Sequence, residues 1–488
     1  MPGRLDFSFL LGGAMPHGAR REPEDPFRVL VVGDFRGRGP GGVPVPAAPS
    51  IQRVDLDTFD ELFTRLQPRA TLAFGGERLE LTFGSLDDFH PDALLQRVPA
   101  LQLLQQERQQ LRDPARAAAL LGKVTAPASP AAPPVAAGTE GSMFERLLGQ
   151  GSAVRREPAA TGLEQMLARL VRPHLAPVPD PRVPDLLASL EATATGLLRE
   201  VLHHAAFQQL EASWRGLHWL LQNVECDEDL QVLVLDMTPA ELTALAATDD
   251  LRGSVLHHLL VERAGAGAHA FSLVVALQAF GTNEADVRTL AAMGALGALG
   301  GFPFVATAMP TILGCASTLD VGNPLSWRPD PEAAMRWRAL RQSPQAARVG
   351  LVLPQFLLRL PYGASTDRID AMPFEEMPMP PEHARYLWGA PGLAVAMLLS
   401  RSFREQGWQM EASTEQEVTG LPAHTVRIGG APRLQPCAEV LLGERAVTAV
   451  GEAGLMVLQS HANRDAARLV QLRSLADPDA GLAGPWHA

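Results

Sequence analysis

Glu200, His203 and His204 are the first residues whose types and spacing could bind a metal ion. On a helix, residues three and four positions apart share a face, so one carboxylate and two imidazoles could meet there. The set lacks the His-Glu-x-x-His pattern of a zinc site, and the second histidine pair, His257 and His258, belongs to no such pattern either. We therefore favour histidines packed on a helix face over a metal site.

Glu375 and Glu376 could act as paired carboxylates in acid–base chemistry, with His383 nearby in the sequence. They lie in the string Met-Pro-Phe-Glu-Glu-Met-Pro-Met-Pro-Pro, whose composition is typical of a surface loop. A solvated or interface acidic pair is therefore the favoured interpretation.

A glycine-rich segment at residues 33–42 follows an apolar run at 27–32 and superficially suggests a phosphate-binding loop. A P-loop needs a terminal Lys-Ser or Lys-Thr, and a dinucleotide fingerprint needs a helix directly after its glycines. The segment has neither, and Pro40 and Pro44 oppose a helix. We interpret it as a loop without a ligand.

Nucleophile signatures are also missing from the sequence. No Gly-x-Ser-x-Gly elbow occurs, and Cys226, Cys315 and Cys437 lie far apart with no Cys-x-x-Cys pair. The odd, sparse cysteine count fits a reducing compartment, and the first residues do not form a signal peptide, so we expect a cytoplasmic protein. We predict no catalytic, cofactor-binding or metal-binding residue, and therefore no enzyme.

Length and composition narrow the class of protein. The 488 residues are 46% hydrophobic and 20% charged, which excludes a mainly disordered chain and favours more than one domain. The net charge of −12, without a basic patch, argues against nucleic-acid binding. The longest uncharged stretch, residues 289–319, is rich in Gly and Pro, so we expect a buried helix, turn and strand and no membrane insertion.

The pattern along the chain predicts a small α/β unit at 1–122, an Ala/Pro-rich linker at 123–160 and a larger α/β unit at 161–488. We expect the first unit to bury a core of its own. Apolar runs and helical spacing predict strands at 27–32, 230–235, 271–277, 302–307 and 349–353, a hairpin over 70–83, and helices at 57–66, 91–111, 162–171, 184–223, 238–247, 285–298 and 331–341. Alternating strands and helices favour a mixed α/β fold.

Charged and aromatic residues are interleaved in several strings that suit buried cores or interfaces. Glu211 and Arg215 are four residues apart on a predicted helix and can pair, which turns Trp214 toward the core. We predict an interface or structural role, and not catalysis, for Glu211, Trp214, Arg215, Arg359, Tyr362, Glu375, Glu376 and Trp388.

These strings resemble the large subunit of the type VI secretion contractile sheath. The matching stretches cover residues 190 to about 470 and are Leu202-His-His-Ala-Ala-Phe-Gln-Gln-Leu-Glu-Ala-Ser-Trp-Arg-Gly-Leu, Pro303-Phe-Val-Ala, Trp337-Arg-Ala-Leu-Arg, Leu353-Pro-Gln-Phe-Leu-Leu-Arg-Leu-Pro-Tyr-Gly, Phe374-Glu-Glu, Tyr386-Leu-Trp-Gly, Phe403-Arg-Glu-Gln-Gly-Trp, Val418-Thr-Gly-Leu-Pro-Ala-His and Pro436-Cys-Ala-Glu-Val.

The first unit resembles the small sheath subunit. Its matching stretches are Phe27-Arg-Val-Leu-Val-Val-Gly-Asp-Phe-Arg-Gly, Val54-Asp-Leu-Asp-Thr-Phe-Asp-Glu-Leu, Leu81-Thr-Phe-Gly-Ser-Leu-Asp-Asp-Phe-His-Pro-Asp and Val98-Pro-Ala-Leu-Gln-Leu-Leu. The chain thus looks like a fusion of both subunits with a two-part phage-tail-sheath-like fold. In that family the two proteins form a heterodimer that stacks into a helical tube around an inner tube.

The resemblance implies a structural protein whose partners are other sheath or sheath-like subunits, together with the inner tube, the baseplate or the disassembly ATPase. It implies no cofactor. The helix predicted at 162–171 occupies the place of the family's ATPase-recognition helix, although a plain interface helix fits its spacing equally well.

Three departures from the family pattern limit these expectations. The chain stops at Ala488, about where large subunits continue into a further domain, and Pro354-Gln355 replaces the family's Pro-Arg. The covalent fusion also alters which strand can be donated to which neighbour. We expect a sheath subunit or a sheath-like accessory that does not build an extended sheath by itself. The alternative is a ligand-binding or enzymatic protein built on the same fold.

Overall fold

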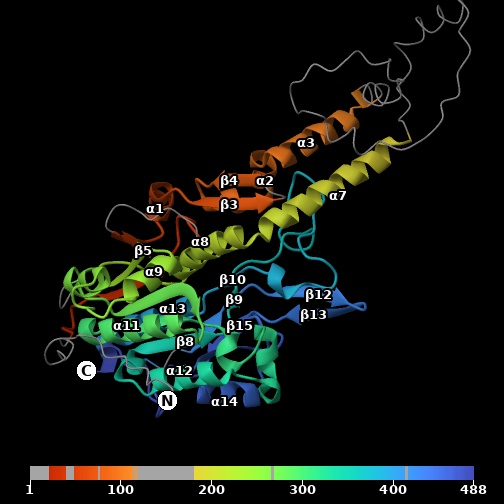
Figure 1. Ribbon diagram of the computed structural model, residues 1–488. Helices are drawn as coiled ribbons and strands as arrows, with labels where there is room; N and C mark the ends of the chain where they lie inside the picture. The colour runs from red at the N-terminus through yellow and green to blue at the C-terminus, as the bar shows by residue number, and fades with distance from the viewer. Residues whose placement is uncertain are drawn as a thin grey trace, which may run out of the picture. The chain divides into compact units, whose positions relative to one another are not determined.

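The computed structural model describes residues 21–39, 49–74, 77–113, 116–117, 181–264, 269–412 and 416–487 (Figure 1). The chain divides into two compact units, one formed by Met1–Ala93 with Arg199–Ala488 and the other by Leu94–Leu198. The predicted linker at 123–160 and the predicted helix at 162–171 lie outside the described residues, so the domain boundaries drawn from the sequence stay a prediction.

Within the described residues, the first unit is built around a nine-stranded sheet in the order β11-β15-β14-β8-β7-β6-β1-β5-β2. The strands are β1 (Phe27–Gly33), β2 (Ile51–Val54), β5 (Leu230–Asp236), β6 (Leu273–Phe280), β7 (Phe304–Ala308), β8 (Val349–Leu353), β11 (Glu417–Thr419), β14 (Met456–Ser460) and β15 (Ala466–Leu469). The strands from β14 to β5 in this order are parallel, and β2, β15 and β11 add antiparallel edges. The predicted mixed α/β class is confirmed.

Strand β1 lies inside this sheet and not in a separate one. It pairs with β5 over its whole length, from Phe27 opposite Leu230 to Gly33 opposite Asp236, and with β6 along its other edge. A parallel strand covered on both faces is mostly apolar, which explains why Arg28 is the one charged residue in the run at 27–33. The segment that we expected to bury a core of its own therefore supplies a central strand to a larger core.

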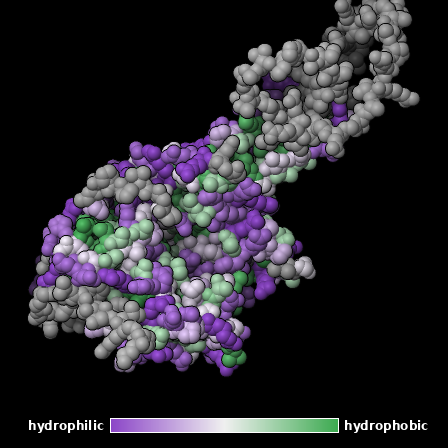
Figure 2. All heavy atoms as spheres, in the orientation of Figure 1, coloured by the Kyte–Doolittle hydropathy of each residue, from purple (hydrophilic) through white to green (hydrophobic). Residues whose placement is uncertain are grey.

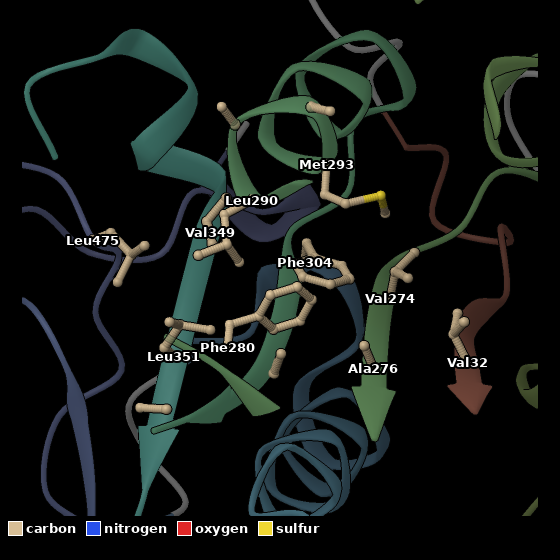
Figure 3. Close-up of a cluster of buried hydrophobic side chains, with 14 of the residues drawn as sticks. Val32, Val274, Ala276, Phe280, Leu290, Met293, Phe304, Val349, Leu351 and Leu475 are labelled. Carbon is tan, nitrogen blue, oxygen red and sulfur yellow. The ribbon is translucent and has the colours of Figure 1, made fainter. Parts of the chain in front are cut away.

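Helices cover both faces of the sheet. Leu290 and Met293 of α11 (Glu284–Gly300) pack on alternate residues of the strands, including Val274 and Phe304 (Figure 3). Helix α13 (Gly392–Gln406) contacts β1, β6 and β7 and begins so close to β6 that a side chain at Gly392 would meet Val275. Further helices are α1 (Phe59–Leu66), α8 (Ala205–Asn223), α9 (Pro239–Ala246), α10 (Val255–His257), α12 (Pro331–Arg341) and α14 (Glu444–Glu452).

Three two-stranded sheets complete the first unit in the described part of the chain. They are β3 (Arg69–Phe74) with β4 (Glu77–Thr82), β9 (Phe356–Leu357) with β10 (Trp388–Gly389), and β12 (His424–Ile428) with β13 (Ala431–Gln435). The hairpin predicted over 70–83 is thereby confirmed.

The second unit contains α3 (Pro99–Arg112) and most of α7 (Val183–Leu202). Leu101 and Leu104 are buried on α3, as are Leu190 and Leu198 on α7. Arg108 Nε donates a hydrogen bond of 2.9 Å to Glu191 Oε1 and so joins the two helices.

The helix expected over 184–223 is in fact two helices, because α7 ends at Leu202 and α8 begins at Ala205. His204 adopts an extended conformation and its Nδ1 accepts a hydrogen bond from the Ala206 amide, which starts the second helix. Helical spacing on both sides of this cap concealed the break.

The described residues include no helix that is both long and apolar enough to cross a membrane. The face of the molecule shown in Figure 2 is mostly hydrophilic, with small apolar areas between the polar ones. The apolar stretch at 289–319 is instead divided between α11, β7 and short turns, as expected.

Trp214 of α8 connects the first segment of the chain to the helices. Its ring is fully buried and contacts Phe35, Phe59 and Phe63, with ring centroids 5.3, 5.6 and 4.3 Å away. Its indole Nε1–H donates a hydrogen bond of 2.8 Å to the carbonyl oxygen of Phe35 in the loop that follows β1. The prediction that Trp214 faces the core agrees with this geometry.

We predict that Trp214→Ala lowers the free energy of unfolding by about 3–5 kcal/mol, because it leaves a large cavity among three aromatic rings. Trp214→Phe keeps most of the packing and loses the indole hydrogen bond, so its loss should be smaller, about 1–2 kcal/mol. Urea unfolding followed by circular dichroism measures both. An unchanged midpoint for Trp214→Ala would contradict the assigned packing.

Candidate functional site

Several predicted site residues meet in one buried group of charged and aromatic side chains, which we call the Arg359 cluster. Its members are His203, Glu211, Arg215, Arg359, Tyr362 and Glu376. His203 lies in the turn before α8, Glu211 and Arg215 lie on α8, and the other three lie in the segment between β9 and β10. The cluster thus ties two distant parts of the sequence together.

Arg359 lies at the centre and bridges two carboxylates. Its Nε donates a hydrogen bond of 2.8 Å to Glu211 Oε1, and its Nη1 donates one of 2.8 Å to Glu376 Oε2. Nη2 lies 3.3 Å from Glu211 Oε2 and 3.2 Å from Glu376 Oε1, so both contacts are bidentate. Burial lowers the pKa of Arg359, but the two carboxylates outweigh burial and raise it well above the ordinary arginine value.

Glu376 is held from several sides. Besides Arg359, its Oε2 accepts a hydrogen bond of 2.8 Å from the Tyr362 amide, and its Oε1 lies 3.2 Å from His203 Nε2. Its own amide donates to the Tyr362 carbonyl oxygen at 2.8 Å. Burial favours the neutral acid, but the attraction of Arg359 and these hydrogen bonds outweigh it and lower the pKa of Glu376 to about 2.

Arg215 and Tyr362 close the other end of the cluster. Arg215 Nε donates a hydrogen bond of 2.7 Å to Glu211 Oε1, and Nη2 donates one of 3.1 Å to the Tyr362 hydroxyl. The Arg359 guanidinium lies 4.2 Å from the centre of the Tyr362 ring, a cation–π contact. Burial raises the pKa of Tyr362 to about 12, so this hydroxyl stays protonated at neutral pH.

The cluster balances its charges, with Arg215 and Arg359 against Glu211 and Glu376. Each carboxylate oxygen has a partner at hydrogen-bonding distance. An acid or base needs a group that can exchange a proton near neutral pH, whereas the pKa values of Arg215 and Arg359 are raised and that of Glu376 is lowered, in each case away from neutrality. The geometry therefore fits a structural role, in which the ion pairs hold chain segments together, better than a catalytic site.

Of the two alternatives expected for Glu375 and Glu376, a solvated or an interface acidic pair, the structure contradicts the solvated pair, because Glu376 is buried. Met372, Phe374 and Glu376 are buried, whereas Glu375 is exposed. Burial alternates along residues 372–376, so Glu376 lies on the same inward side as Met372 and Phe374. Glu375 keeps a surface position, where its Oε1 accepts a hydrogen bond of 3.0 Å from the Ala364 amide.

The residues considered for a metal site point to different partners. His203 contacts Glu376, while His204 caps α8 and its Nε2 accepts a hydrogen bond of 3.3 Å from the Ala73 amide. Glu200 is exposed. Across the described residues, no three His, Cys, Asp or Glu side chains are grouped as they would be to hold a metal ion.

Trp388 lies outside the Arg359 cluster. It is half-buried, stacks on His383 with ring centroids 5.1 Å apart, and donates a hydrogen bond of 3.0 Å from Nε1 to the His383 carbonyl oxygen. His383 therefore packs against the tryptophan, and its Nε2 lies 3.5 Å from Glu439 Oε1.

Sequence reasoning missed a second polar group at the ends of β1 and β5. Asp236 Oδ1 accepts hydrogen bonds from the amides of Phe35 and Arg36 at 2.9 and 3.1 Å, and Asp236 Oδ2 lies 3.0 Å from Arg38 Nη2. Arg38 also contacts Glu241, which forms the capping box of α9. The Thr-x-x-Glu pattern at 238–241 was the available signal, and these contacts hold the loop at 33–39 in place.

We predict that Glu376→Gln lowers the free energy of unfolding by about 3–5 kcal/mol, because it leaves one buried arginine charge without its balancing carboxylate. Glu375→Gln is the matched control, one residue away and exposed, and should change stability by less than about 0.5 kcal/mol. Urea unfolding of the two variants beside the wild type provides the comparison. Equal stability of the two variants would show that the buried charge balance is unimportant.

The lowered pKa of Glu376 also predicts a pH dependence. A carboxylate whose pKa falls from about 4.5 to about 2 on folding contributes stability that is fully present above pH 4.5. That contribution, at most about 3 kcal/mol, is lost as pH falls from about 5 toward 2. The stability difference between wild type and Glu376→Gln should therefore shrink as unfolding is measured at pH 7, 5, 4 and 3. A constant difference would be inconsistent with this assignment.

Comparison with known proteins gives matches to two family models on the same chain. The model described as EvpB/VC_A0108, tail sheath N-terminal domain, matches residues 185–476. The model described as Type VI secretion system, VipA, VC_A0107 or Hcp2, matches residues 14–119. The first match includes Glu211, Arg359 and Glu376, and the second includes β1.

Two curated relatives from Pseudomonas aeruginosa are each similar to part of the chain. The chain is 33% identical over 309 residues to the type VI secretion system sheath protein TssC1, which is 61% of this chain and 62% of the relative. It is 29% identical over 104 residues to the sheath protein TssB1, which is 20% of this chain and 60% of that relative. The chain thus spans less than two thirds of each relative's length, and it belongs to the tail sheath family of type VI secretion systems, with regions similar to two different sheath proteins fused in one polypeptide.

Proposed function

We propose that the chain is a structural component of a type VI secretion apparatus, either a sheath subunit or a sheath-like accessory. In this proposal one polypeptide supplies what the family otherwise divides between a small and a large sheath subunit. In this proposal the Arg359 cluster holds α8 to the segment between β9 and β10 and carries out no reaction.

The pairing of β1 with β5 and β6 is the observation that carries the proposal. β1 lies in the region matched by the VipA model, and β5 and β6 lie in the region matched by the tail sheath model. The two regions therefore share one hydrogen-bonded sheet and one hydrophobic core. This is the arrangement expected if they replace two subunits that act together.

We infer that the partners are other sheath subunits, and that the inner tube, the baseplate or a disassembly ATPase are further candidates. The protein would work in the cytoplasm. The family of the two regions supports the first class of partner, and the three further candidates rest on the family resemblance alone. An enzymatic role has no support from the Arg359 cluster, because its charged groups are mutually paired.

The test is incorporation into a sheath. Purified full-length chain with a gold-labelled tag is added while conventional small and large sheath subunits assemble, and the tubes are sedimented and examined by electron microscopy. We expect the label in the pellet, along the tubes or at their ends. Glu375→Gln should behave like the wild type, and Glu376→Gln should lose incorporation in step with its folded fraction. A folded chain that stays in the supernatant would contradict the structural role.

A further inference from the structure

Glu439 is a buried carboxyl group with no arginine beside it. It is 6% exposed and lies in the segment between β13 and α14. Its Oε2 accepts a hydrogen bond of 2.8 Å from the Gln355 amide. In the described part of the chain its ion-pairing partner is His383, and no arginine or lysine. Its environment therefore differs from that of Glu376, whose charge is balanced by Arg359.

His383 Nε2 is the group that faces this carboxyl. The nitrogen lies 3.5 Å from Glu439 Oε1, is shielded from solvent and forms no hydrogen bond with a described residue. His383 begins the short helix η8 (His383–Arg385), and its ring stacks on Trp388. A carboxyl oxygen and an imidazole nitrogen can share a proton, so the two side chains form a complementary pair.

Burial favours the neutral form of both groups. It raises the pKa of Glu439 above the ordinary value of 4.5, although the hydrogen bonds from the Gln355 amide and the Thr318 side chain oppose this change. It lowers the pKa of His383 below the ordinary value of 6.5. The pair is therefore a neutral acid whose O–H group faces a neutral imidazole, which leaves no net charge in the interior.

The other titratable groups on the surrounding elements are bonded elsewhere. Strands β9, β10 and β14 contribute no titratable side chain. The groups on or beside η8 and on the short helix that carries Thr318 have other partners: Arg385 pairs with Glu382 at 2.6 Å, the Tyr386 hydroxyl with His424 at 2.8 Å, and Asp320 with the Ser317 amide at 3.1 Å. The charge state of Glu439 thus depends on its own proton.

The two sides of this contact are held to different degrees. The Glu439 amide donates a hydrogen bond of 2.9 Å to the Gln355 carbonyl oxygen, and the preceding Ala438 amide donates one of 2.7 Å to the Ser460 hydroxyl. His383 instead belongs to the segment between β9 and β10, in which η8 is the one described helix. The backbone of Glu439 is therefore fixed, and the side that carries His383 is the one that can move.

We propose that the contact between Glu439 and His383 is a proton-dependent switch, which holds η8 in place while Glu439 is protonated and releases it when the proton is lost. The proton passes to solvent and leaves a carboxylate beside a neutral imidazole. The buried negative charge then has no cation to balance it and must gain water, so η8 moves away from Glu439. The switch is independent of the sheath role, because it acts within a single chain.

The first test is the pH dependence of stability, measured by urea unfolding of the full chain and of Glu439→Gln, which keeps the shape of the neutral acid and cannot ionise. Because folding raises the pKa of Glu439, its contribution to stability is fully present below pH 4.5 and is lost as pH rises through the folded pKa. The unfolding constant of the wild type, divided by that of Glu439→Gln, should therefore rise above pH 4.5 by up to about tenfold per pH unit and then level off. A ratio that is constant or falls would overturn the proposal.

The second test follows the release of η8 by trypsin cleavage after Arg385, with the cut identified by mass spectrometry. Wild type and Glu439→Gln are compared at the same pH, so the pH dependence of the protease cancels. We expect the ratio of their cleavage rates to rise about threefold or more between about pH 6 and pH 8. Equal rates at both pH values would show that no switch operates.

Gln355→Arg is the second variant and keeps the test valid if Glu439→Gln does not fold. Gln355 and Glu439 lie opposite each other beside the bridge between Phe356 and Ala438, so their side chains share a face. An arginine at position 355 would balance the carboxylate, and cleavage after Arg385 should then stay slow as pH rises. A Gln355→Arg protein that is cleaved like the wild type at both pH values would overturn the proposal.

Discussion

Backbone hydrogen bonding along both edges of β1 holds the first unit together. Seven consecutive residues of β1 are in register with β5, and four are in register with β6. Without β1, two neighbouring strands would each leave a row of amide and carbonyl groups unpaired in the interior, where water cannot replace the lost partners. The loop that follows β1 also places Phe35 against Trp214. The position of α8, and of Glu211 on it, therefore depends on a strand that comes from the other end of the sequence.

The Arg359 cluster is a second constraint on the fold, after the pairing of β1. It contributes more to selecting one arrangement of the chain than to the net free energy of folding. Moving four charged groups out of water is costly, and their mutual attraction often does little more than offset that cost. Our interpretation is that the cluster selects one arrangement of the segment between β9 and β10, which contains little regular structure of its own. Arg359 can satisfy Glu211 and Glu376 together only if α8 and this segment meet in a single register. Apolar contacts alone would tolerate small shifts.

The sequence could predict the features that neighbouring residues encode, such as strands, but not the polar contacts between residues that are far apart in the chain. Strands β1, β5 and β8 were found because buried parallel strands are nearly continuous apolar runs, a signal contained within a few residues. The pairing of Glu211 with Arg215 was found because it spans one helical turn. The second partner of Glu211, Arg359, is 148 residues away from it in the sequence, and no local pattern joins the two. The burial of Glu376 was missed for the same reason, since composition describes a loop and not the direction in which each side chain points. The position of β1 in the sheet could not be predicted either, because its partners β5 and β6 are far away in the sequence.

The central position of β1 has a consequence for synthesis on the ribosome. Arg28 in β1 and Gln231 in β5, which are hydrogen-bonded in the folded protein, are 203 residues apart. At roughly 5–20 residues per second, about 10–40 s pass between the emergence of β1 and that of its first parallel partner. During that interval an apolar strand with two unpaired edges is outside the ribosome. The nascent chain must therefore protect β1 transiently, by local collapse or by binding a chaperone, before the sheet can form.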